Sequence, residues 1–169
     1  MDEFENRKRK LLGPIYFETG AALYDCQCFE YQIAYFLYLM SRHGDVGMDP
    51  ARYTAIMDDE EKQTAGQLVK LLTSHVRVSD EIEQGLVLAL RARNKLIHRY
   101  LIDNVERLLD VGQHERIVKE IRSLRSAVRQ CHAKLDPFVK HYAEMLDGVD
   151  LDEIGAEAKR KFLDTAREH

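Results

Sequence analysis

The feature that most constrains the fold is an apolar stripe in the last third of the chain. Its members recur at alternating spacings of four and three: Ile117, Ile121, Leu124, Val128, Cys131, Leu135, Phe138, Tyr142 and Met145. Residues at these spacings share one face of an α-helix, so the stripe predicts one long helix packed along other long helices. Pro137 falls inside the stripe and predicts a kink or a brief break, and Gly148 predicts the helix end.

A second stripe with the same spacing lies near the start of the chain. It runs through Ile15, Thr19, Ala22, Cys26, Phe29, Ile33, Leu37 and Met40. The pattern predicts a first long helix that begins after Pro14 and ends near Gly44.

Shorter helices are predicted between and after these stripes. Asp49-Pro50 is typical of a helix start and predicts a helix through Met57, and the acidic residues 58–61 suit the start of the next helix. Residues 76–79 are interpreted as a connector, and Ser79 begins a helix that extends to about Leu101. Two further helical segments are expected at 105–109 and 151–167.

These patterns predict an all-α fold, specifically an antiparallel up-and-down bundle of four main helices plus short helices. A length of 169 residues favours a single domain. We expect a flexible basic N-terminal segment at 1–14, the bundle at 15–147, and a C-terminal helix packed on the bundle at 148–169.

Composition limits the classes of function. The formal net charge of −4 argues against a surface built entirely for nucleic acid but allows a local basic patch. Three cysteines imply no disulfide framework. We expect no signal peptide and no membrane-spanning segment, hence a cytoplasmic protein. The histidines show no metal-binding spacing, so no metal and no cofactor are predicted.

Two charged residues break the apolar patterns. At 100° per residue, Arg93 falls in the middle of the apolar face of its helix, whereas His98 falls near the edge of that face. Glu30 lies inside the stripe of the first helix. A buried guanidinium is costly unless it is paired or faces a cleft, so Glu30 and Arg93 are candidates for a structural salt bridge across the interior.

The helix that contains Arg93 also carries a recognisable motif. Arg93-Asn94-x-x-x-His98 resembles the Arg-x4-6-His motif of the HEPN superfamily, and Tyr100 completes an Arg-x4-His-x-Tyr form seen in HEPN toxins that pair with nucleotidyltransferase antitoxins. The resemblance covers roughly residues 15–147, including Cys26-x-x-x-Glu30 on the first helix and the segment 64–68.

The resemblance implies a homodimer in which two motif helices face each other, and in many members a metal-independent endoribonuclease of defence or toxin–antitoxin systems. On this hypothesis His98 transfers the proton and Arg93 stabilises the phosphate as charge develops. Asn94 would orient the imidazole or bind the RNA backbone. Tyr100 would donate to phosphate or be the hydroxyl that an antitoxin modifies. Glu30 would support Arg93.

Three basic neighbours on the same helix, Arg91, Lys95 and Arg99, are predicted to attract the RNA substrate. Two alternatives to a nuclease stay open. One is a non-catalytic dimeric HEPN module that binds RNA, nucleotide or a protein partner. The other is a plain helical bundle in which Arg93 and Glu30 only fix the packing.

Overall fold

The computed structural model describes residues 3–44, 49–58 and 63–167 of the chain, and within these ranges the fold is all-α, without strands. Its helices are α1 (Glu3–His43), α2 (Pro50–Met57), α3 (Ala65–His75), α4 (Asp80–Asn94), α5 (Tyr100–Asp103), α6 (Val105–Leu109), α7 (His114–Asp147) and α8 (Leu151–Arg167). A π-helical turn, Lys95–Arg99, joins α4 to α5, and a 3₁₀ turn, Val111–Gln113, leads into α7.

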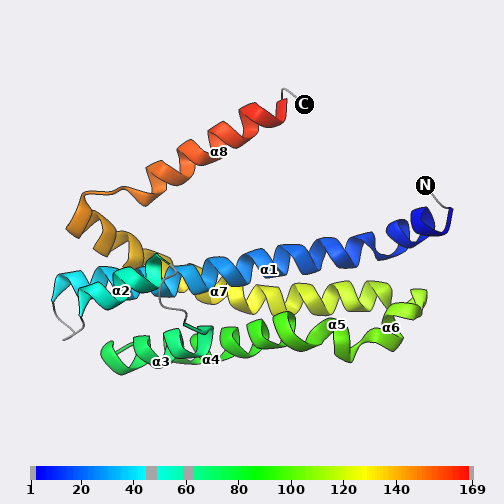
Figure 1. Ribbon diagram of the computed structural model, residues 1–169, viewed down its shortest axis with the longest axis horizontal. Helices are drawn as coiled ribbons and strands as arrows, with labels where there is room; N and C mark the ends of the chain where they lie inside the picture. Colours follow the sequence, from blue (N-terminus) through cyan, green and yellow to red (C-terminus); the bar gives the residue numbers. More distant parts are fainter. Residues whose placement is uncertain (1–2, 45–48, 59–62, 168–169) are drawn as a thin grey trace.

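Three long elements lie side by side and form the core: α1, α7, and the continuous run of α4, the π turn and α5 (Figure 1). Salt bridges give their directions. Glu18 pairs with Arg122 and Arg42 pairs with Asp147, so α1 and α7 run parallel. Glu81 pairs with Lys134, so α4 runs opposite to α7.

The apolar stripes of α1 and α7 meet at the centre of this bundle. Ile15, Phe29, Ile33 and Leu37 of α1 are fully buried, as predicted from their spacing. On α7 the stripe is buried as far as Leu135, apart from the partly buried Leu124, after which Val139 and Ala143 are buried in place of Phe138 and Met145. A strict spacing of 3.5 residues drifts around a straight helix of 3.6 residues per turn, so the buried face moves to new positions near its end.

Two helix starts differ from the prediction. The first helix begins at Glu3 rather than after Pro14, and Pro14 lies inside it. A proline removes one backbone hydrogen bond, and α1 continues through Pro14 despite that loss. The helix expected from the acidic residues 58–61 begins at Ala65 instead; residues 59–62 lie outside the described part of the chain.

Other predicted boundaries are confirmed. Asp49 caps α2 with its side chain, Ser79 caps α4, and residues 76–79 form the connector before it. Gly148 ends α7 with a left-handed φ of 63°, a backbone conformation that glycine adopts without steric cost. Pro137 lies inside α7 without breaking it.

The C-terminal helix corrects a further expectation. Although α8 has the predicted bounds, it is not packed along the bundle: it meets the end of α7 and extends away from it (Figure 1). Residues 152–165 are all exposed, including Ile154 and Phe162. Its apolar face is therefore open to solvent.

Candidate functional site

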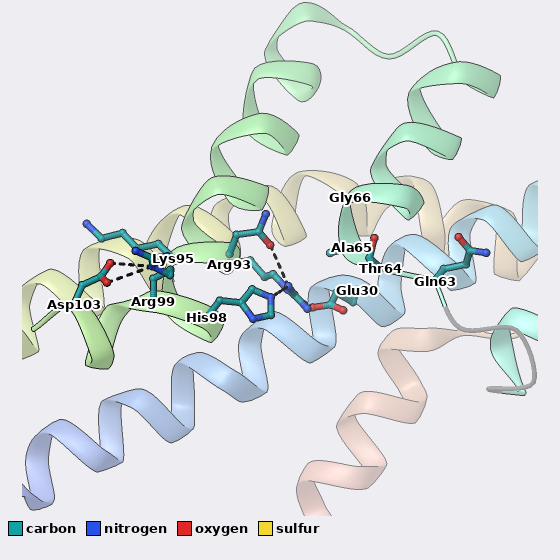
Figure 2. Close-up of a pocket in the computed structure, with 11 residues that line it drawn as sticks. Glu30, Gln63, Thr64, Ala65, Gly66, Arg93, Lys95, His98, Arg99 and Asp103 are labelled. Atoms are coloured by element: carbon teal, nitrogen blue, oxygen red, sulfur yellow. Dashed lines mark hydrogen bonds and ion pairs between the residues drawn. The ribbon is translucent and has the colours of Figure 1, made fainter. Parts of the chain in front are cut away.

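A pocket of about 770 Å³ opens where the π turn passes α1 and the start of α3 (Figure 2). Three cationic and two acidic side chains lie on its wall, together with His98. It is lined by Glu30, Gln63, Thr64, Ala65, Gly66, Arg93, Asn94, Lys95, His98, Arg99 and Asp103. We call it the motif pocket.

Arg93 lies at the centre of this pocket and contacts three polar side chains. Its Nε donates to Glu30 Oε1 at 2.6 Å, and its Nη1 donates to Asn94 Oδ1 at 3.0 Å. The same Nη1 lies 3.0 Å from His98 Nε2. Because a guanidinium can only donate, Nε2 of His98 accepts in this contact, which places the proton of the neutral ring on Nδ1.

The pairing of Glu30 with Arg93, one of the predicted interpretations, is therefore present. The two side chains are 24% and 15% exposed, so the ion pair is largely shielded from water yet borders an open pocket. Glu30 fixes the Nε edge of the guanidinium, which leaves the other edge directed toward His98. A structural role for the pair and a role in the pocket are compatible.

The π turn explains how Arg93 and His98 come together. In a regular α-helix, residues five apart point about 140° away from each other. Here the backbone N–H of Tyr100 bonds to the carbonyl of Lys95, five residues back, which defines a π turn. The wider turn places residues five apart on the same side of the helix, and such turns occur frequently at functional sites.

Not every residue predicted for the site is in the motif pocket. Lys95 and Arg99 line it, and Arg99 pairs with Asp103 at 3.3 Å. Arg91 lies on another part of the surface, beside Asp80 and Glu83, and does not line the motif pocket.

Tyr100 requires a larger correction. Its ring is 2% exposed, and its hydroxyl donates to Glu120 Oε2 on α7 at 2.8 Å. Two residues beyond His98, it faces the opposite side of the helix, toward the core. Neither of the predicted roles, phosphate donor or modified hydroxyl, fits a buried side chain. Burial and the bond to Glu120 raise the pKa of the tyrosine, so it stays protonated.

The start of α3 is the part of the pocket that site prediction missed. Thr64 and Gln67 form a capping box: Thr64 Oγ1 accepts from the Gln67 amide, and Gln67 Oε1 accepts from the Thr64 amide at 2.7 Å. The positive end of this helix dipole adds to the cations on the pocket wall. The sequence signal was Thr-x-x-Gln ahead of an apolar run.

A second, apolar pocket of about 280 Å³ adjoins the first and shares His98 and Arg99 with it. It lies between α1 and the π turn, and Leu23 and Ile102 are among its lining residues. Leu23 is 45% exposed and Ile102 is 74% exposed. An exposed apolar surface thus begins directly beside the imidazole.

Among the described residues, no group of three or more potential ligands lies close enough to hold a metal ion. No helix in the described ranges has the length and apolar character required to cross a bilayer. Comparisons with family models, curated proteins and solved structures find no match to this chain.

Proposed function

We propose that this protein is a HEPN-type endoribonuclease that acts as a homodimer, with Arg93 and His98 as its catalytic residues and RNA as its substrate. One observation carries the proposal: the guanidinium of Arg93 and the imidazole of His98 meet at 3.0 Å on the wall of an open pocket. The resemblance of residues 91–101 to the HEPN motif supplies the class of reaction.

The reaction needs no nucleophile from the protein. The 2′-oxygen of the RNA bonds to the adjacent phosphorus while the bond from phosphorus to the 5′-oxygen breaks. His98 takes the proton of the 2′-hydroxyl, and an acid returns a proton to the departing 5′-oxygen. The products are a 2′,3′-cyclic phosphate and a free 5′-hydroxyl. In a homodimer, the histidine of the second copy supplies that acid.

Arg93 has two tasks in this scheme. In the free protein its Nη1 occupies the Nε2 lone pair of His98, which a base must have available. When a phosphate enters the pocket, Nη1 turns to the stronger acceptor, which stabilises the developing negative charge and releases the imidazole. Glu30 holds the Nε edge throughout and so limits how far the guanidinium moves.

The surroundings support an anionic substrate and a second copy. Lys95 and Arg99 add positive charge to the pocket wall, and the start of α3 adds the positive end of a dipole. Ile102, Val105 and Leu109 beside and beyond the motif are 74%, 53% and 82% exposed. Exposed apolar side chains in such number are typical of an interaction surface.

One observation favours a second candidate, a non-catalytic HEPN module that binds RNA, nucleotide or a protein partner. In the free protein Arg93 already bonds to Glu30, Asn94 and His98, in a polar network centred on its guanidinium. In this alternative the network remains intact when RNA binds. A partner nucleotidyltransferase, expected from the resemblance to toxin pairs, loses its proposed target here because Tyr100 is buried.

The test is cleavage of labelled RNA by the purified chain in excess EDTA. His98→Ala and Arg93→Ala should each lower the rate by about 100-fold or more, as removal of an acid–base group or a charge-stabilising donor does. Arg91→Ala is the matched control, because it removes a cation from the same helix outside the pocket. RNA binding without turnover supports the second candidate, whereas cleavage that survives His98→Ala rules out the proposed mechanism.

A further inference from the structure

The exposed face of α1 carries a second stripe with helical spacing, opposite to the buried one. Three aromatic residues alternate in it with two glycines and a glutamine: Gly13, Phe17, Gly20, Tyr24, Gln27 and Tyr31. The three aromatic side chains are 72%, 66% and 62% exposed in chain order. We call this set the outer stripe of α1. The aromatic row continues toward the end of the helix, where Tyr31 and Tyr35 stack at 6.2 Å.

The two glycines of the outer stripe are not explained within one protomer. A Cβ added at Gly13 or Gly20 would meet no atom within 4 Å among the described residues. Both lie inside a helix, where glycine costs roughly 1 kcal/mol relative to alanine. A glycine on a helix surface leaves room for a bulky side chain from another chain, and Gly13 and Gly20 differ from other open glycines because exposed aromatic side chains of the same stripe stand beside them.

We propose that the outer stripes of two copies pack against each other in an antiparallel pair, with the two-fold axis near Ala22. In this register Gly20 of each copy receives Tyr24 of the other, and Gly13 receives Tyr31. Phe17 then lies over Gln27. The same register satisfies all three pairs, so the stripe is complementary to itself.

Charge selects the antiparallel orientation. Residues 7–10, Arg-Lys-Arg-Lys, are exposed at the start of α1 and outnumber the two glutamates of its first turn, Glu3 and Glu5, of which Glu5 pairs with Lys8. The opposite end of the bundle carries Asp147, Asp150, Asp152 and Glu153 around the junction of α7 and α8. Arg42 and Lys140 pair with two of these carboxylates and leave an acidic excess. An antiparallel pair brings the basic start of one copy toward the acidic end of the other, whereas a parallel pair would place basic runs together.

The surface is large enough to form the centre of a dimer. Aromatic side chains present roughly 150–250 Å² each, so the exposed fractions of Phe17, Tyr24 and Tyr31 offer roughly 300–500 Å². A standard interface buries about 800 Å² per partner. Exposed Tyr16 and Leu23 border the stripe and provide further apolar area.

The helix α8 of the same chain is the other possible occupant, and its length argues against it. It starts beside Lys140 of α7, to which Asp152 is ion-paired, and Lys140 lies seven residues before Asp147, the partner of Arg42 near the end of α1. At 1.5 Å per residue its 17 residues span about 25 Å, which reaches back only to about the middle of α1. Folded onto α1, it would reach no further than about Gly20 and would leave Gly13 and Phe17 uncovered.

This inference deepens the proposed function, on which it rests for the existence of a homodimer, because it names the surface of association. Ala22 and Leu23 also line the apolar pocket beside His98. The proposed two-fold axis therefore lies at the same level along α1 as the motif.

The test measures association of the full chain by sedimentation, without RNA. Wild type should sediment as a dimer of 19.7 kDa chains. Gly20→Leu should raise the dimer dissociation constant by roughly 30-fold or more because it fills the site of Tyr24. Gly155→Leu is the matched control: Gly155 is also a helical glycine with open space around it, on α8, and its replacement should leave the dimer intact. Circular dichroism melting should show that both variants fold.

A mixing experiment tests the register. Gly20→Glu and Tyr24→Lys should each weaken the dimer, and the two variants mixed should associate, since residue 20 of one copy meets residue 24 of the other. Parallel pairing would give no such rescue. A monomeric wild type, or a dimer unaffected by Gly20→Leu, would overturn the interface. If the dimer depends on Gly20 but RNA stays intact, the nuclease proposal fails and the interface stands.

Discussion

At the level of single residues, the placement of each carboxylate decides what its neighbouring cation can do. Glu30 holds Arg93 by one edge and leaves the other edge facing the motif pocket. The Glu120 carboxylate instead accepts hydrogen bonds from two Arg107 nitrogens, both at 3.0 Å, and from the Tyr100 hydroxyl. These bonds connect α7 to the end of the motif segment. The first pairing leaves a cation available to a ligand, and the second is structural.

Glu120 provides a prediction for pH. Bonds from Arg107 and Tyr100 lower the pKa of this carboxyl from 4.5 to about 2 in the folded protein. Its ionised form therefore stabilises the fold above about pH 4.5, and this contribution is lost as the pH falls from 4.5 toward 2. Glu120→Gln should lower the melting temperature near neutral pH and by much less at about pH 3.

Chemical denaturation of both proteins at several pH values measures this difference. A destabilisation by Glu120→Gln that is equally large at about pH 3 and pH 7 would contradict the assignment. Glu115→Gln is the matched control, because Glu115 lies on the same helix and its pKa is lowered only by an exposed partner, Lys119.

At the level of helices, the π turn determines the register of the motif. It accommodates one more residue than an α-helical turn, so Arg93 and His98 stay on one side although five positions separate them. Deletion of Lys95 should restore a regular α-helix in which these two residues are four apart and still adjacent. Insertion of one alanine after Asn94 should rotate His98 by about a further 100°.

The two register variants therefore have opposite outcomes. The Lys95 deletion should keep its melting temperature and a measurable rate of RNA cleavage, while the insertion should lose cleavage. Lys95→Ala is the control for the deletion, because it removes the charge of Lys95 without changing the register of the helix. Equal loss of cleavage in the deletion and the insertion would contradict a role for the π turn.

The helices also show what the sequence could and could not predict. Caps at Asp49 and Ser79 and the stripe from Ile15 to Met40 gave the elements correctly, because local hydrogen bonds and one buried face determine them. The direct contact of the Arg93 and His98 side chains was not predicted, because the angle of 100° per residue that places side chains around an α-helix does not apply across a π turn. Whether a turn is α or π depends on packing, which spacing alone does not reveal.

At the level of the whole molecule, the three long elements leave several apolar surfaces open: the outer stripe of α1, the region from Ile102 to Leu109, and α8. The direction of α8 was not predictable, because an amphipathic pattern gives a face to be buried but not the partner that buries it. The sequence did supply the motif residues and the ion pair of Glu30 with Arg93. It misplaced Tyr100 and Arg91, whose sides of the helix follow from the three-dimensional register.

The central claim is that Arg93 and His98 act together on an RNA phosphodiester without a nucleophile from the protein. The most direct measurement is mass spectrometry of the product ends, made in EDTA with a substrate carrying a single ribonucleotide in a DNA strand. The account predicts one cut, 3′ to that ribonucleotide, which leaves a 2′,3′-cyclic phosphate and a 5′-hydroxyl and disappears in His98→Ala. Cleavage of the all-DNA strand, or 5′-phosphate ends, would contradict it.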